Sequence, residues 1–316
     1  MEQHQKISQL QVGDSLEGFY VLKSAFSKVS SNGKPFLNAV LSDQTGDIDA
    51  KVWDYSGPVG GGDEGKVVLV RGTVTEFRGA AQVTVDAIRL AEEGDRYEAS
   101  DLVPVAPIDP QLMFEEVRGL LESIGDPDYR AAALELLHRH EAAFRSIPAA
   151  KSVHHGFLNG LLMHTGNMLK LADFLAGLYG DLVDRDLLLT GTFAHDLQKE
   201  TEFVFSQLGL VTGYSARGQL LGHLVMGAQE AAEVARQVNM PEEKSVLLQH
   251  LILSHHGEPE FGAAVVPMCP EGELLSLIDK LDSRMEIYRE ELEKLKPGEV
   301  SRRIFALDKR IYRRAD

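Results

Sequence analysis

The spacing of apolar residues changes once along this 316-residue sequence, and that change limits the fold more than any other feature. Residues 18–90 contain five short segments rich in Val, Leu, Phe and Thr, at 18–27, 35–42, 46–53, 66–75 and 81–90. The stretches between them, SNGK, SDQTG, SGPVGGGDEG and EFRGA, have turn compositions. Five short strands with an alternating pattern predict a small closed β-barrel.

From residue 111 onward, apolar residues recur at three- and four-residue spacing, which is typical of amphipathic helices. Residues 91–110 contain three prolines and little periodicity, so they indicate a linker. We therefore predict a multidomain β plus α protein. Its parts are a barrel at 1–92, a linker at 93–110 and an all-α domain at 111–316 with a basic tail at 299–316.

Composition narrows the setting in which the chain works. No run of 18 apolar residues and no basic-then-apolar start is present, so we expect neither a membrane span nor a signal peptide. The lone Cys269 fits a reducing cytoplasm. A net charge of −16 argues against a surface coated for duplex DNA, although bound cations can reverse the field at a site. Residues 299–316 hold six Lys or Arg against three acids; a solvated helix end is favoured over phosphate contact.

Histidines and aspartates recur in apolar helical segments of the second half. They are His164 (GLLMHT), His195 and Asp196 (TFAHDLQKE), His223 (LLGHLVMG), His255 and His256 (LILSHHG) and Asp279 (LLSLIDKLD). One such histidine alone is usually a hydrogen-bonded core residue. Because five helices pose the same problem, and buried polar groups need partners, a shared metal cluster explains them together. In an adjacent His-Asp pair, the imidazole binds one ion and the carboxylate bridges two, about 3.5–4 Å apart.

This order, H…HD…H…HH…D, resembles the HD-domain superfamily of metal-dependent phosphohydrolases. The resemblance implies a helical bundle in which His164, His195, Asp196 and Asp279 hold a first divalent ion. Asp196 would bridge to a second ion held by His223, His255 and, less firmly assigned, His256. Over nearly its full length, from the barrel through HHGFLNGLLMHT, HDLQKE, LSHHGEPEFGAAVVPM and LIDKLDSRM, the sequence resembles the YhaM-type 3′→5′ exoribonucleases.

That family resemblance implies trimming of single-stranded RNA from the 3′ end, with some action on single-stranded DNA. The cofactors would be two divalent ions, Mn²⁺ first, with Co²⁺, Fe²⁺ and Mg²⁺ as alternatives. A homo-oligomer is a further expectation. Lys199 is predicted either to neutralise a phosphate oxygen or to pair at the surface with Glu200 or Glu202. His154 and His155 are predicted to contact substrate rather than metal.

Closed barrels of this kind bind single strands by stacking bases on aromatic side chains beside a basic groove. About half of the barrel's aromatics must fill its core, and alternation alone does not say which. Phe36 and Trp53 are predicted to be exposed. The predicted nucleic-acid contacts are Phe36, Trp53, Lys34, Lys51, Arg71, Arg78 and Arg217. The alternative is a barrel that serves assembly.

Two other functions compete with the exoribonuclease hypothesis. One is a phosphohydrolase of small nucleotides or cyclic dinucleotides, which would need no strand-binding barrel. The other is a non-catalytic RNA-binding scaffold with a vestigial site, against which the complete ligand set argues. No G-x-S-x-G or Walker-type motif indicates a different chemistry.

Overall fold

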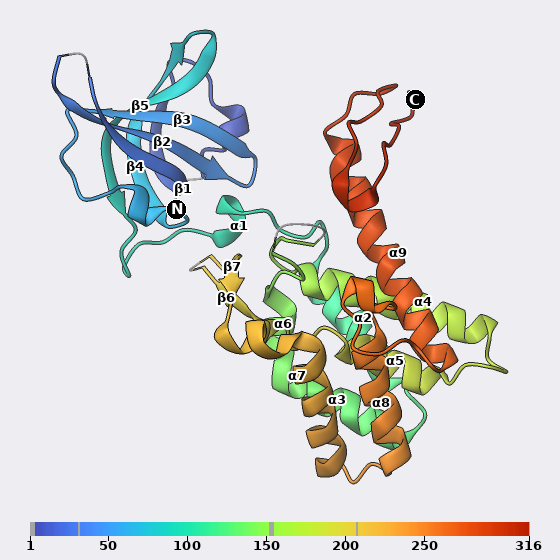
Figure 1. The fold of residues 1–316 in the computed structure, drawn as a ribbon. Coiled ribbons are helices and arrows are strands. Elements are labelled where there is room, and N and C mark those ends of the chain that lie inside the picture. The colour runs from blue at the N-terminus through green and yellow to red at the C-terminus, as the bar shows by residue number, and fades with distance from the viewer. Residues whose placement is uncertain (1–3, 31, 152–154, 207, 316) are drawn as a thin grey trace. The chain divides into compact units, whose positions relative to one another are not determined.

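The computed structural model describes residues 4–30, 32–151, 155–206 and 208–315 (Figure 1). It divides into two compact units, Met1–Val105 with Ser206–Leu208 and Ala106–Phe205 with Gly209–Asp316. The first is a β-barrel followed by the short helix α1 (Ala99–Leu102), and the second is mainly helical. The boundaries at residues 92 and 110 that we inferred from the sequence stay predictions.

The barrel is closed by five strands in the order β1-β2-β3-β5-β4, in which only the β3–β5 pairing is parallel. The strands are β1 (Ser15–Val29), β2 (Pro35–Asp43), β3 (Gly46–Trp53), β4 (Val67–Phe77) and β5 (Ala80–Leu90). Leu22, Leu37 and Val70 point inward and are fully buried, as strand alternation requires. The glycine-rich connection between β3 and β4 contains one short 3₁₀ turn, Gly61–Asp63. The predicted five-stranded barrel is confirmed.

As predicted, the second unit is a helical bundle, and its described residues form eight helices. They are α2 (Pro110–Glu122), α3 (Pro127–Ser146), α4 (Gly160–Leu178), α5 (Arg185–Ala194), α6 (Lys199–Glu202), α7 (Ala216–Gln237), α8 (Glu242–Ser254) and α9 (Pro270–Glu293). The carboxylates of Asp109, Asp126 and Asp184 cap α2, α3 and α5 by accepting backbone N–H bonds. Phe114, Phe144 and other apolar side chains fill the core between the helices.

Two short strands add to the helical prediction: β6 (Phe203–Phe205) and β7 (Val211–Tyr214) form an antiparallel pair between α6 and α7. Their aromatic side chains explain this, because the Phe203 and Tyr214 rings meet across the pair at 5.4 Å. The segment is too short for the periodicity of the sequence to reveal it.

The basic tail corrects our prediction of a solvated helix end. Helix α9 ends at Glu293, and Pro297 with Gly298, whose φ is +82°, prevents its continuation. The chain then folds back on itself through antiparallel bridges between Val300 and Tyr312 and between Ile304 and Lys309. The tail is therefore a hairpin.

Within the described ranges, no helix combines the length and apolar character needed to cross a membrane.

Candidate metal centre

Six predicted ligands from separate parts of the sequence lie together inside the helical bundle. Helix α4 contributes His164, the end of α5 contributes His195 and Asp196, α7 contributes His223, the end of α8 contributes His255, and α9 contributes Asp279. Four of the six are at most 3% exposed, so they occupy the interior of the unit. The tertiary structure thus brings together residues that are more than 100 positions apart in the sequence.

Asp196 lies in the middle of this group, and its two carboxylate oxygens face different histidines. Its Oδ2 lies 3.2 Å from His195 Nε2 and 3.8 Å from His164 Nε2. Its Oδ1 lies 3.3 Å from His223 Nε2 and 3.8 Å from His255 Nε2. Each carboxylate oxygen therefore faces a different pair of imidazoles, which is the arrangement that a bridging carboxylate requires.

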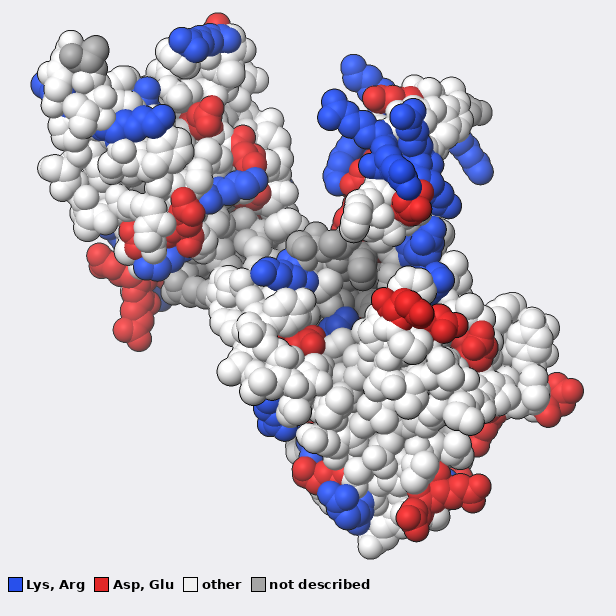
Figure 2. Space-filling model, in the orientation of Figure 1, with Lys and Arg blue, Asp and Glu red and all other residues white. Residues whose placement is uncertain are grey.

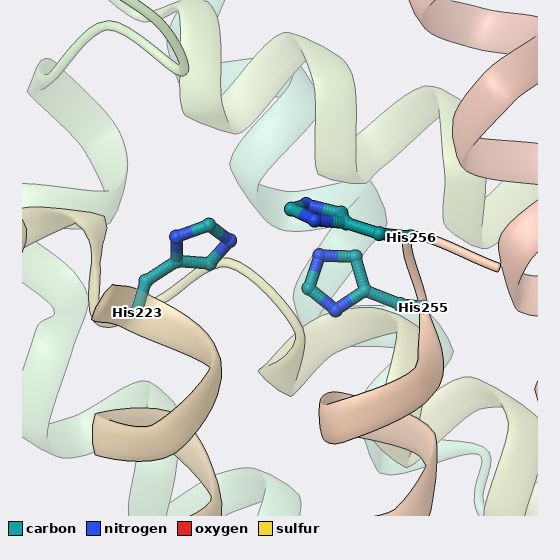
Figure 3. Close-up of side chains that lie close together, drawn as sticks. All are labelled: His223, His255 and His256. Carbon is teal, nitrogen blue, oxygen red and sulfur yellow. The ribbon is translucent and has the colours of Figure 1, made fainter. Parts of the chain in front are cut away.

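The two sides of Asp196 differ in their further donors. On one side, Asp279 Oδ1 lies 3.4 Å from His164 Nε2. On the other side, His223, His255 and His256 offer ligand atoms within 4.8 Å of one another. Figure 3 shows these three imidazoles turned toward a common space from α7 and from the end of α8. His256 is thus placed where a third imidazole ligand on that side would lie.

Backbone carbonyls fix the ring orientation of two histidines. His195 Nδ1 lies 2.7 Å from the carbonyl of Thr192, and His255 Nδ1 lies 2.7 Å from the carbonyl of Ile252. Because a carbonyl only accepts hydrogen bonds, each Nδ1 carries the hydrogen and donates it. These bonds leave each Nε2 as the ring nitrogen that faces Asp196 and that can bind a metal.

Carboxylates play the same part for the other two histidines. His164 Nδ1 bonds to Asp282 Oδ2 at 2.8 Å, and Asn167 donates to the second oxygen of Asp282 at 3.1 Å. His223 Nδ1 bonds to Glu202 at 3.0 Å. The sequence analysis missed both carboxylates. For Asp282 the sequence did contain an indication of its role, since it follows Asp279 by three residues and so lies on the same face of the helix. For Glu202 the sequence contained no such indication.

Gly222 directs His223 into the site. Its φ of +70° interrupts α7, and a residue with a Cβ would be strained there. The helix restarts after this kink, and the His223 backbone N–H donates to Glu202 Oε1 at 3.1 Å. One Glu202 carboxylate thus accepts from both the backbone and the ring of His223, which fixes the ring's position.

Buried polar atoms without hydrogen-bond partners at the centre of this cluster indicate whether it can bind a metal. His195 Nε2, His223 Nε2, His255 Nε2 and Asp196 Oδ1 are buried and have no hydrogen-bond partner among the described residues. Leaving four polar atoms buried in this way is costly. Imidazole and carboxylate donors that converge on one space satisfy a divalent cation, and a cation would in turn satisfy them. The residues present fit divalent metal binding.

Electrostatics support this assignment. Burial would raise the pKa of Asp196, but the His195 ring and the Lys199 ammonium hold it well below its usual range. Burial, with the neighbouring His195 and His256 rings, holds the pKa of His255 well below its usual range. The centre therefore offers an ionised carboxylate and, at His255, a neutral imidazole, which are the forms that bind metals.

Lys199 lies at the centre rather than at a surface ion pair. Its ammonium donates to Asp196 Oδ2 at 2.6 Å, and its side chain is 16% exposed. This corrects the alternative in which it pairs with Glu200 or Glu202. Burial lowers the pKa of Lys199, but Asp196 outweighs that effect and raises it, so the ammonium stays charged.

Two adjacent histidines, His154 and His155, precede α4. His154 lies outside the described residues. His155 is fully buried, its ring lies 5.1 Å from that of His164, and its Nε2 is 3.4 Å from Asp282 Oδ2. It therefore stands behind a predicted metal ligand. Substrate contact by His154 and His155 stays a prediction.

Another buried histidine, His140, lies outside the metal centre. His140 on α3 bonds through Nδ1 to Glu200 at 2.8 Å and through Nε2 to Glu230 at 2.9 Å. Gln198 donates to Glu230 at 2.6 Å. Burial lowers the pKa of His140, but the two carboxylates raise it to about 9. This imidazolium joins α3 to α7 and to the turn that follows Asp196.

The barrel places three aromatic rings around one lysine. Lys51 Nζ lies 4.4 Å from the Trp53 ring, 4.7 Å from the Phe36 ring and 5.8 Å from the Phe77 ring, and Arg78 lies over Phe77 at 5.2 Å. Trp53 is 53% exposed and Phe77 is 52% exposed. Phe36 is only 9% exposed, which corrects our prediction for it, because Trp53 and Lys51 cover its ring. We call these five residues the aromatic–cation cluster.

The remaining predicted contacts lie elsewhere. Lys34 pairs with Asp54, next to Trp53, at 2.6 Å. Arg71 is exposed, but it lies six positions before Phe77 on β4, which is about 20 Å along a strand. Arg217 is exposed in the first turn of α7, in the helical unit. The structure therefore groups four of the seven predicted contacts, Phe36, Trp53, Lys51 and Arg78.

Comparison with known families agrees with the fold and the site. An HD domain model matches residues 161–284, which contain all the predicted metal ligands. A model of an OB-fold nucleic acid binding domain matches residues 21–91, which cover most of the barrel. The protein is thus an HD-domain protein with an N-terminal OB-fold.

Two curated relatives cover nearly the whole chain. The 3′-5′ exoribonuclease YhaM of Halalkalibacterium halodurans is 38% identical over 307 residues, 96% of this chain and 93% of the relative. The 3′-5′ exoribonuclease YhaM of Geobacillus sp. (strain WCH70) is 39% identical over 308 residues, 96% of this chain and 92% of the relative. The chain belongs to the YhaM 3′-5′ exoribonuclease family.

Proposed function

We propose that this protein is a metal-dependent 3′→5′ exoribonuclease that hydrolyses phosphodiester bonds of single-stranded RNA. The observation that carries the proposal is the position of Asp196, whose two oxygens face two separate sets of imidazoles. The names of the two relatives, 3′-5′ exoribonuclease YhaM, support the direction of trimming and RNA as the substrate. Action on single-stranded DNA and assembly as a homo-oligomer are further parts of the proposal.

The donor set suggests how two ions would be held. His164, His195, Asp196 and Asp279 would hold one, and Asp196, His223, His255 and His256 the other. We propose Mn²⁺ first, with Co²⁺, Fe²⁺ and Mg²⁺ as alternatives, on the basis of the family resemblance. When bound, two divalent ions would supply activation of water at neutral pH and neutralisation of negative charge on the phosphate.

The chain's own residues complete the site. Asp282 and Glu202 hold the rings of His164 and His223 so that each Nε2 points inward. Lys199 keeps its positive charge beside Asp196. We propose that it neutralises a non-bridging phosphate oxygen as negative charge develops there. No side chain in this arrangement has to form a covalent intermediate.

The barrel gives the proposed substrate a second place to bind. Trp53 and Phe77 expose ring faces beside Lys51 and Arg78, and such pairs stack bases while attracting the backbone phosphates. A substrate of one or two nucleotides would not need this surface. The aromatic–cation cluster therefore favours a polynucleotide over a small nucleotide.

A trimming assay on metal-stripped protein tests the proposal. The substrate is single-stranded RNA labelled at its 5′ end, with Mn²⁺ added back, and the matched control RNA has a blocked 3′ end. We expect a ladder that shortens from the 3′ end only with metal and only on the unblocked RNA. Intact RNA alongside hydrolysis of cyclic dinucleotides or nucleoside monophosphates would overturn the proposal. Unchanged trimming by a His195→Ala, Asp196→Ala variant would overturn the site assignment.

A further inference from the structure

Lys and Arg residues are concentrated in the C-terminal basic hairpin, residues 298–314. It holds six Lys or Arg against two Asp or Glu, although the whole chain has 32 against 48. Figure 2 shows this charge as a dense group of blue side chains over the end of α9 and the hairpin. A basic surface on an acidic protein indicates attraction for a polyanion.

The hairpin is a folded part of the helical unit. Leu307 and Ile311 are buried against Ile287 of α9. Arg313 donates to the carbonyls of Leu292 at 3.0 Å and Leu295 at 2.6 Å, at the end of the helix. These contacts hold the hairpin on the C-terminal end of α9.

The outer side of the hairpin presents its charges to solvent. Arg302, Arg310 and Arg314 are exposed, and none forms a salt bridge with any residue that the structure describes. Arg303, by contrast, pairs with Asp308. Three guanidinium groups are thus available for phosphate, which they bind in a fixed fork geometry.

Aromatic rings lie among these arginines. Phe305 at the tip is 100% exposed, and Tyr312 is 56% exposed. Tyr312 also lines a cavity of about 520 Å³ together with Arg289, Arg313 and Arg314. An exposed ring beside several guanidinium groups is the combination that stacks a base while contacting phosphates.

Helix α9 connects this surface to the metal centre. It carries Asp279 in its middle and ends at Glu293, next to the hairpin. Fourteen helical residues span about 21 Å. A single strand with its 3′ end at the metal centre would reach the hairpin within a few nucleotides if it followed α9.

We propose that the C-terminal basic hairpin is a further binding site for the single-stranded RNA substrate, on its 5′ side and in addition to the metal centre and the barrel. This rests on the proposed exoribonuclease function. Arg302, Arg310 and Arg314 bind phosphates there, and Phe305 and Tyr312 stack bases. Because neither kind of contact reads a base edge, the binding is independent of sequence.

The test compares two triple variants that remove the same charge. One is Arg302→Gln, Arg310→Gln, Arg314→Gln, and the control is Arg118→Gln, Lys170→Gln, Arg236→Gln, which lies on other helices of the same unit. Binding of 5′-fluorescein-labelled single-stranded RNA is measured by anisotropy without divalent metal over a range of salt. We expect the hairpin variant alone to bind at least tenfold more weakly at low salt. Its slope of log Kd against log salt should fall by about 2.

Two further measurements separate the outcomes. Mn²⁺-dependent hydrolysis of bis(p-nitrophenyl) phosphate reports the metal centre, and we expect both triple variants to keep it. Phe305→Ala, a change at a fully exposed side chain, should weaken RNA binding about tenfold even if the triple variant fails to fold. If the wild-type protein trims no RNA, the proposed function fails.

If the wild-type protein trims RNA while both triple variants bind it equally well, the inference alone fails. Wild-type RNA binding by the Phe305→Ala variant would remove the stacking role. A mass in solution that drops only in the hairpin variant, with RNA binding unchanged, would show that the hairpin joins copies of the chain, which would overturn the inference. Recruitment to anionic lipid vesicles in place of RNA would overturn it as well.

Discussion

The metal centre and the aromatic–cation cluster of the barrel are built in opposite ways. At the metal centre, His195 and Asp196 are buried, and each histidine of the pairs facing Asp196 has a hydrogen-bond partner at Nδ1 that fixes its ring. In the barrel, Trp53 and Lys51 meet through a cation–π contact at 4.4 Å, with the indole half in solvent. The first arrangement is held rigidly and the second is open.

This difference follows from what each region has to do. Binding of metal ions needs donor atoms whose positions are fixed to within a few tenths of an ångström. Burial and the hydrogen bonds at Nδ1 of each histidine fix them in this way. Binding of a flexible single strand needs ring faces and charges that accept any base. We therefore expect substitutions at the metal centre to abolish the reaction and substitutions in the barrel to weaken substrate binding. The predictions below test this contrast.

The largest effect is expected at Asp196. Replacing it with Asn removes the charge that faces both sets of imidazoles, and we expect Mn²⁺-dependent activity to fall about a thousandfold or more on both RNA and bis(p-nitrophenyl) phosphate. Rates on the two substrates and bound metal by elemental analysis provide the check. Asp181→Asn, at an exposed position, serves as the control. Activity within tenfold of wild type would contradict a bridging role.

A smaller loss is expected at Glu202, which does not face the proposed ions but holds His223. Glu202→Ala frees both the ring and the backbone N–H of His223, so the Mn²⁺ concentration for half-maximal activity should rise about 10- to 100-fold. Titration of activity with Mn²⁺ measures this, with the exposed Glu243→Ala as the control. An unchanged requirement for Mn²⁺ would mean that ring orientation at His223 does not depend on Glu202.

His140 and its two carboxylate partners lie outside the metal centre, so we expect them to affect the stability of the fold rather than catalysis. The pKa of His140 is raised to about 9 by Glu200 and Glu230, above its ordinary value near 6.5. The stabilisation is therefore fully present below about pH 6.5 and is lost as the pH rises through about 9, on the order of 2 kcal/mol in the free energy of unfolding. Urea unfolding of wild type and His140→Gln across this range is the measurement. Parallel curves for the two proteins would refute the assignment.

The smallest effect is expected in the barrel. Trp53→Ala removes one stacking surface, so KM for single-stranded RNA should rise about five- to tenfold while kcat stays within twofold. Hydrolysis of bis(p-nitrophenyl) phosphate should not change. Val29→Ala on β1, also well exposed, is the matched control. A drop in kcat, or a loss on the small diester, would place Trp53 in the catalytic reaction and break the contrast between the two regions.

The residues that the sequence predicted as metal ligands lie together in the structure, and the sequence could single them out because burying a polar group is costly. His164 and His195 stood in apolar helical segments, where an ionisable side chain needs a specific partner. Exposed residues give no such signal. Alternation in β2 and β3 did not distinguish Phe36 from Trp53, because which ring covers the other depends on how neighbouring strands pair.

The sequence by itself determined the five barrel strands, the helical character of the second unit and the residue types that could bind metal, since these follow from local periodicity and from the energetic cost of burial. Only the tertiary structure decided which distant carboxylate fixes each ring. Glu202 reaches His223 because α7 is kinked at Gly222, and Asp282 reaches His164 because α4 and α9 pack together. Hydrogen bonds of this kind depend on the positions of whole helices, which no local pattern in the sequence encodes.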